Sequence, residues 1–126
     1  FFLLPTVVAF LVTAEEQTIF HAGDLNWWHW DGEPDPWNPD MERSFKAFSQ
    51  PLSGRSIDLA FLLIDPRQEK NAFLGADYFL KLAKIRRFIP MHQWGKFEFT
   101  NDFLAKYPQY REKTLPVLHT GQVFEL

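Results

Sequence analysis

The segment IDLAFLLI, residues 57–64, constrains the fold more than any other part of the chain, because it is apolar on both faces after Asp58. Successive side chains of an extended strand point to opposite faces of a sheet. A strand that is apolar on both faces is typical of a sheet covered on both sides, as in α/β proteins. We therefore expect residues 57–64 to form a central, buried strand.

The remaining pattern predicts a mixed order of strands and helices. Further strands are indicated at residues 7–13, 18–22, 88–91, 115–118 and 123–126, the last two as a hairpin. Helices are indicated at residues 40–49, 72–84 and 100–107, the first with Asp40 as its N-cap. The order β-β-α-β-α-β-α-β-β has no repeat and no linker. It predicts a single domain over residues 1–126, of the α/β (α+β) class with a mixed sheet.

The chain starts with an almost unbroken apolar run, FFLLPTVVAFLV, at residues 1–12. This run is too short to span a bilayer, which needs about 20 apolar residues, and it lacks the basic start of a signal peptide. We expect buried strands here, because the valines and Phe10 favour extended structure. The alternative is the remnant of a signal peptide that ends near Ala14, in which case the domain is secreted. The first interpretation predicts a cytoplasmic protein with no membrane partner.

Charge is unevenly distributed along the chain. Residues 1–42 hold eight acidic and no basic residues, whereas residues 43–126 hold 13 basic and eight acidic ones. The acidic part also carries Trp and His, as a cation site or a polar-ligand pocket would, and a solvated acidic loop has the same composition. The net charge of −3 provides no broad basic surface, so we expect no nucleic-acid partner. The absence of cysteine excludes disulfides and thiolate metal sites.

Two of the expected strands end in residues that can bind a metal ion. Gly23 and Asp24 follow the strand at 18–22, and His92 follows the strand at 88–91. In layered α/β folds, ligands gather where strands end and loops begin. Carboxylate and imidazole suit zinc, manganese or iron, and a carboxylate can bridge two cations about 3.5–4 Å apart. Alternatively, Asp24 caps a turn and His92 is structural.

Three strings of residues surround these strand ends: IFHAGDLNWWHW at 19–30, IDLAFLLIDPRQ at 57–68 and FIPMH at 88–92. Together they resemble the metallo-β-lactamase superfamily, in the branch near the ascorbate-6-phosphate lactonase-like hydrolases. The resemblance runs from about Val8 to about Lys96. The tryptophan-rich extension after Gly-Asp is its most specific part.

The resemblance implies a metal centre and a reaction. Asp24 is then the carboxylate that bridges two Zn²⁺ or Mn²⁺ ions, and His92 is a ligand of the second ion, so that both are catalytic residues. A metal-bound hydroxide attacks the carbonyl of a lactone, ester or amide, or a phosphoester centre. The protein is then a hydrolase with a small-molecule substrate.

The superfamily's most diagnostic motif, His-x-His-x-Asp-His, does not occur in the sequence. The resemblance therefore implies that residues 1–126 are the C-terminal half of an αβ/βα sandwich, with a mixed sheet and helices on its outer face. The missing N-terminal half is then the natural partner, and the chain alone is inactive. Because half a sandwich leaves one sheet face uncovered, we expect self-association.

The tryptophan-rich loop has two interpretations. Trp27, Trp28 and Trp30 form either the wall of a substrate pocket or a lid packed on the body of the protein. His29, between them, either contacts substrate or donates a hydrogen bond that fixes the loop. The alternative function for the chain is a non-catalytic binding module, in which the loop at 27–37 meets a partner.

Arg67 and Lys96 are candidate ligands for an anionic substrate group. Arg67 can make a bidentate contact with such a group, or it can pair with Asp65 or Glu69 nearby. Lys96 follows His92 closely in sequence and can bind a substrate carboxylate or phosphate.

Overall fold

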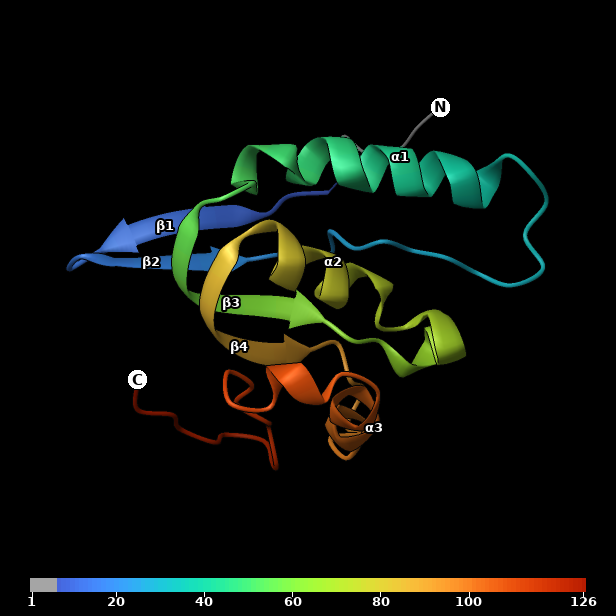
Figure 1. Ribbon diagram of the computed structural model, residues 1–126. Coiled ribbons are helices and arrows are strands. Elements are labelled where there is room, and N and C mark those ends of the chain that lie inside the picture. The colour runs from blue at the N-terminus through green and yellow to red at the C-terminus, as the bar shows by residue number, and fades with distance from the viewer. Residues whose placement is uncertain (1–6) are drawn as a thin grey trace.

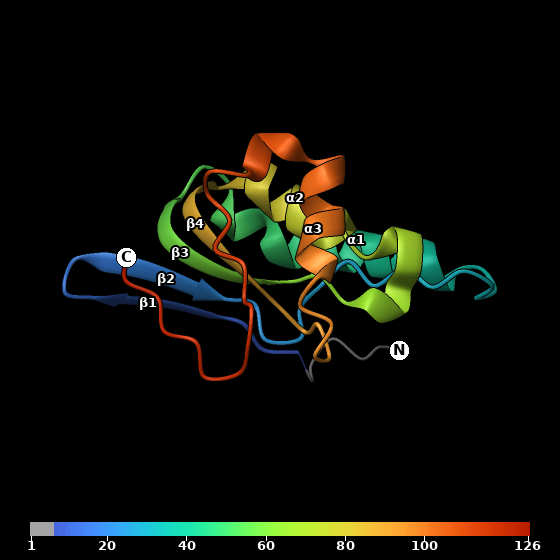
Figure 2. The ribbon, with the colours of Figure 1, turned by 90° about the horizontal axis from the view of Figure 1, so that it is seen from below.

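A computed structural model describes residues 7–126, which form a four-stranded sheet with helices on one face (Figure 1; Figure 2). The strands lie in the order β1 (Phe10–Ala14), β2 (Gln17–His21), β3 (Ser56–Leu63) and β4 (Lys84–Met91). The helices are α1 (Trp37–Ser49), α2 (Leu74–Leu82) and α3 (Phe99–Lys106), and the short 3-10 helices are η2 (Gln50–Leu52), η3 (Pro66–Asn71) and η4 (Pro108–Tyr110). The expected α/β class with a mixed sheet is confirmed.

The direction of each strand follows from the length of the connection before it. β1 and β2 are antiparallel and are joined by Glu15 and Glu16, whose φ angles of 50° and 65° are those that a tight hairpin turn requires. β2, β3 and β4 are parallel neighbours, and parallel pairs need a long crossover. α1 lies in the first crossover and α2 in the second. As a result, the carboxyl ends of β2, β3 and β4 lie side by side, at the same end of the three strands.

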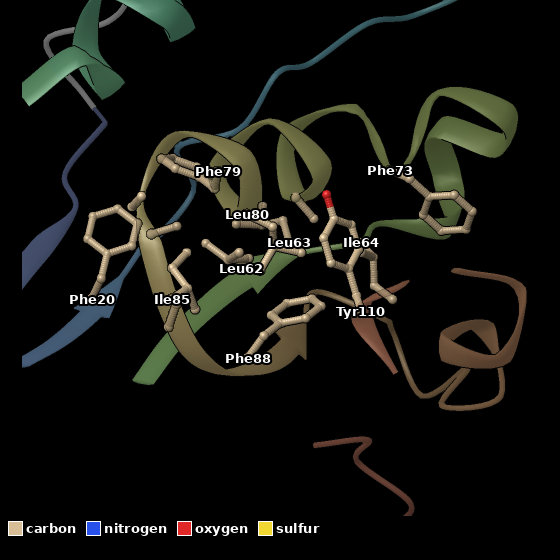
Figure 3. Packing of buried hydrophobic residues seen from close by; sticks show 14 of the residues in the cluster. Phe20, Leu62, Leu63, Ile64, Phe73, Phe79, Leu80, Ile85, Phe88 and Tyr110 are labelled. Atoms are coloured by element: carbon tan, nitrogen blue, oxygen red, sulfur yellow. The ribbon is translucent and has the colours of Figure 1, made fainter. Parts of the chain in front are cut away.

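The face of the sheet that meets the helices forms the core (Figure 3). Phe20, Ala60 and Phe88 lie side by side on β2, β3 and β4, and none is more than 4% exposed. Phe79 of α2 packs its ring 5.3 Å from that of Phe20, and Phe45 of α1 lies 5.1 Å from Phe79. Each large apolar side chain buried in this way contributes about 1.5–3 kcal/mol, so this layer holds helices and sheet together.

The prediction that residues 57–64 form a central strand is confirmed for β3, which has β2 and β4 as neighbours. The helices cover one face of the sheet (Figure 2). The other face, here called the open face, carries two rows of side chains: Phe10–His21–Phe61–Ile89 and Val12–Ile19–Leu59–Arg87. The C-terminal segment crosses part of the open face and leaves a hollow of about 540 Å³ over Leu59, Phe61 and Ile89. The cover on this second side is therefore irregular chain.

The prediction of buried strands in the first 12 residues is wrong for β1. All five of its residues are exposed, and Phe10 and Val12 are 55% and 49% exposed. The β1–β2 hairpin extends beyond the helical layer, so no helix covers its tip (Figure 2). Residues 1–6, which hold the rest of the apolar run and of a signal-peptide remnant, lie outside the described residues.

The predicted C-terminal hairpin is also wrong. Residues 115–126 contain no strand, and a single isolated bridge joins Thr114 to Phe88. The N–H of Phe88 donates to Lys113, and the N–H of Leu115 donates to Phe88. The next donor along β4 in this ladder would be the nitrogen of Pro90, which carries no hydrogen, so the pairing stops there.

Among the element boundaries that differ from the prediction, two have identifiable reasons. α1 begins at Trp37 rather than at Asp40, because Pro39 lies in the first turn, where a helix needs no backbone donor. β4 begins at Lys84 rather than at Phe88, and its charged start faces solvent at the edge of the sheet. No helix within residues 7–126 is long and apolar enough to cross a membrane.

We expect Phe88→Ala to lower the free energy of unfolding by about 3–5 kcal/mol, because it empties a site that is 0% exposed. Urea unfolding measures this loss. Phe48→Ala is the matched control, since Phe48 lies on α1 and is 54% exposed, and it should change stability by about 0.5 kcal/mol or less. Equal losses in the two variants would contradict the core described above.

The outer edge of β1 predicts self-association. The strand FLVTA carries no charge, whereas the opposite edge of the sheet, β4, holds Pro90 and several basic side chains that discourage pairing. Val12→Lys should weaken association by about tenfold, or ~1.4 kcal/mol, as measured by analytical ultracentrifugation. Phe48→Lys places the same charge on the helical side and should leave association unchanged. Wild-type protein that stays monomeric at every concentration would contradict this expectation.

Candidate functional site

Three side chains with acid or base chemistry follow the three parallel strands. Asp24 comes after β2, Asp65 after β3 and His92 after β4. Because the strands are parallel, their carboxyl ends meet at one edge of the sheet, which is where α/β folds bind ligands. We call Asp24, Asp65 and His92 the strand-end cluster.

Gly23 sets the direction in which Asp24 leaves the sheet. Its φ angle is +61°, and a Cβ at this position would collide with the backbone oxygen of Val8. Glycine alone tolerates both conditions. The N–H of Gly23 also donates to Nδ1 of His21 over 3.0 Å. The turn leaves the Asp24 side chain 74% exposed, where it is free to contact a ligand.

His92 lies between the two carboxylates of the cluster. Its Nε2 is 2.8 Å from Oδ1 of Asp24, and its Nδ1 is 3.4 Å from Oδ2 of Asp65. The backbone of His92 has a φ of +66°, a conformation that is rare outside glycine and is concentrated at functional sites. Asp24 and His92, the two residues expected to bind metal, are thus in direct contact.

Asp65 is the enclosed member of the cluster, with a side chain that is 0% exposed. Its carboxylate accepts hydrogen bonds from the backbone N–H and guanidinium of Arg67 and from Nε1 of Trp94. Burial raises the pKa of this carboxyl, but the hydrogen bonds from Arg67, Trp94 and His92 outweigh burial and lower the pKa from 3.8 to about 2. Asp65 is therefore an anion at neutral pH.

Tryptophans flank His92 on two sides. The rings of Trp28 and Trp94 meet the imidazole edge-on at 6.2 and 6.1 Å. Trp30 stacks on Trp28 at 5.7 Å, and Nε1 of Trp28 donates to the backbone oxygen of Asp24 over 3.0 Å. Trp28 and Trp30 are half-buried, so their rings form a wall beside the strand-end cluster.

Trp27 points the other way, into the helical layer. Its ring packs 6.2 Å from both Phe45 and Tyr78, with Nζ of Lys46 4.6 Å from its centre. This position matches the interpretation of the loop as a lid packed on the body of the protein. Adjacent tryptophans therefore have different roles: Trp27 anchors the loop, and Trp28 faces the strand-end cluster.

His29, Arg67 and Lys96 make other contacts. The backbone N–H of His29 donates to Gln68, and its Nε2 lies 3.9 Å from Asp31. Arg67 takes the second role considered for it, since its guanidinium pairs with Asp65 at 2.6 Å. Lys96 is exposed in the turn that follows His92.

Asp65 and Trp94 belong to this site but are not among the residues expected from the sequence. Asp65 stands shortly after the end of its strand, as Asp24 does, and this shared place at a strand end is the signal that points to it. No comparable signal marks Trp94, because its place depends on left-handed turns at His92, Trp94 and Gly95, with φ angles of 66°, 56° and 79°.

The donors of the cluster suit a metal ion but are few. A carboxylate oxygen and an imidazole nitrogen are ligands for zinc and manganese. Within residues 7–126, no group of three or more His, Cys, Asp or Glu side chains is arranged to hold a metal ion. Asp24 and His92 alone would bind a metal weakly and unselectively, so they fit one part of a metal centre.

Comparison with known proteins gives no relative for this chain: no protein family, no curated protein and no solved structure matches it. What the site can do chemically therefore follows from its own geometry.

The low pKa of Asp65 predicts loss of stability in acid. Because the pKa falls from 3.8 in the unfolded chain to about 2 in the fold, the stabilisation is complete above about pH 5 and is lost progressively as the pH falls through 2. Between pH 5 and pH 2, wild type should lose about 2 kcal/mol more than Asp65→Asn, as measured by urea unfolding. Asp102→Asn changes an exposed carboxyl on α3 and should behave as wild type. Parallel losses in wild type and Asp65→Asn would contradict the assignment.

Proposed function

We propose that this chain belongs to a cytoplasmic, metal-dependent hydrolase of the metallo-β-lactamase type. The substrate is a small molecule with a lactone, ester, amide or phosphoester group. One observation carries the proposal: Nε2 of His92 lies 2.8 Å from Oδ1 of Asp24. These residues are 68 positions apart and come from strands that are not neighbours in the sheet. Two metal-binding side chains meet where an α/β fold places its ligands.

The chain's own residues divide the work. Asp24 and His92 would hold the metal, zinc or manganese, which lowers the pKa of a bound water and polarises a substrate oxygen. Asp24 has the exposure to reach a shared ion, and His92 is held by its turn. Trp28 and Trp30 provide a flat, half-buried wall that can pack against substrate and exclude water.

Further ligands have to come from outside residues 1–126. We place them in an N-terminal half that carries a His-x-His-x-Asp-His motif and packs on the open face. The open face supports this placement, since it holds two mostly apolar rows and a hollow of about 540 Å³ that irregular chain only partly covers. An apolar sheet face of this kind needs a second layer.

A second candidate function is a binding module without catalysis. The stacked pair Trp28 and Trp30 favours it, because two parallel indoles beside an exposed carboxylate offer a ready surface for a ligand or partner. In this case Asp24 and His92 simply pair with each other.

Metal content distinguishes the two functions. We expect elemental mass spectrometry to find about two zinc or manganese ions per molecule of the longest natural protein that contains this sequence. Asp24→Ala and His92→Ala should lose one or both ions. Residues 1–126 alone should hold little metal and hydrolyse nothing.

Matched controls are Asp102→Ala and His119→Ala, which remove the same side-chain types at exposed positions away from the strand ends. They should retain all the metal. A longest natural protein that binds no metal would overturn the hydrolase and leave the tryptophan pair as a binding surface.

A further inference from the structure

Asp65 is a buried charge with no role in the function proposed above. Taking a carboxylate out of water is costly unless it is paired and hydrogen-bonded. Oδ1 accepts from the backbone N–H and Nε of Arg67, both at 3.0 Å. Oδ2 accepts from NH2 of Arg67 at 2.6 Å and Nε1 of Trp94 at 3.2 Å, and it faces Nδ1 of His92 at 3.4 Å. Both oxygens are therefore surrounded by donors, and one of them is aimed at His92.

The imidazole of His92 cannot satisfy both of its carboxylate neighbours in its neutral form. A neutral ring carries one N–H, on either Nδ1 or Nε2. The side chain of Asp24 is 74% exposed and can take hydrogen bonds from water, whereas that of Asp65 is fully enclosed and cannot. Water can replace the imidazole N–H at Asp24 but not at Asp65, and this difference favours a hydrogen on Nδ1, although Asp24 is closer to the ring.

The ring is also held in orientation. Asp65 caps η3 through the N–H of Arg67, and its contact with the guanidinium is a two-point fork. The guanidinium lies over Trp94 at 4.7 Å, and Trp94 meets His92 edge-on. Arg67 thus holds the carboxylate of Asp65 in place on the Nδ1 side of the His92 ring, away from Asp24.

We propose that Asp65 is the positioning residue for His92: it keeps the hydrogen on Nδ1 and so leaves the lone pair of Nε2 for a metal shared with Asp24. The significance for metal binding rests on the proposed function, whereas the tautomer is a property of the metal-free chain. A carboxylate behind a ligating histidine fixes the tautomer and ring direction and raises the basicity of the ligand.

Asp65→Asn should reverse the tautomer of His92 while keeping the size of the side chain at position 65. The backbone N–H of Arg67 donates to Oδ1 and is fixed by the start of η3, whereas the guanidinium of Arg67 is 54% exposed and can turn to water. The amide oxygen of the new side chain therefore takes the place of Oδ1, and its NH₂ group faces Nδ1 of His92. Nδ1 must then accept, and the ring proton moves to Nε2. Asn also serves as a helix cap, so η3 keeps its start.

Nitrogen-15 NMR of the histidine ring tests the tautomer in the full chain, without metal and at a pH where the ring carries one proton. His92→Gln identifies the signals of His92. We expect Nδ1–H in wild type and Nε2–H in Asp65→Asn. Asp102→Asn makes the same change at an exposed carboxyl on α3 and should keep Nδ1–H. Wild type with Nε2–H, or an Asp65→Asn variant with an unchanged tautomer, overturns the proposal; if that variant does not fold, wild type alone decides.

Metal titration tests this proposal separately from the hydrolase function on which it rests. With Zn²⁺ alone as the probe, in competition with a coloured chelator, Asp65→Asn should weaken binding by about 10–100-fold in the longest natural protein, and Asp102→Asn should not. Equal affinities of wild type and Asp65→Asn would overturn the positioning role in metal binding. Wild-type protein without zinc affinity would instead overturn the hydrolase, and the tautomer result would decide the role of Asp65 by itself.

Discussion

The parallel pairing of β2, β3 and β4 is the constraint on which the rest of the structure depends. Parallel neighbours require long crossovers, and α1 and α2 provide them on a single face of the sheet (Figure 1; Figure 2). The same pairing brings three strand ends to one edge. The gathered side chains and the open face are therefore two results of one topology.

The two carboxylates of the strand-end cluster lie in different environments. Asp24 is exposed and can meet a ligand, whereas Asp65 is enclosed and fixed by Arg67. Two carboxylates can thus have different roles: that of Asp24 faces the ligand, and that of Asp65 faces His92, which lies between them. The fork from Arg67 and the cap of η3 make this division rigid, because each restrains the same carboxylate.

The inner strand, the class of the fold and the contact partners Asp24 and His92 could be predicted from the sequence, because each follows from local pattern and from strand ends. The exposure of β1 could not, since Phe10 and Val12 favour a strand whether or not anything covers them. Trp27 and Trp28 are neighbours of the same type, and only the packing of Trp27 against α1 and α2 shows that it anchors the loop while Trp28 faces His92. Asp65 follows the same rule as Asp24, but its burial depends on Arg67 and Trp94, which sequence spacing does not place.

The left-handed backbone at His92 and Trp94 has a consequence for protein engineering. Side chains other than glycine and asparagine hold such a conformation at a cost of about 1–2 kcal/mol each. A library selected for heat resistance alone would therefore enrich glycine at both positions, and its most durable members would lack the imidazole. Hardier versions of this chain are better sought among core and surface positions remote from the turn, with residues 92 and 94 held fixed throughout the selection.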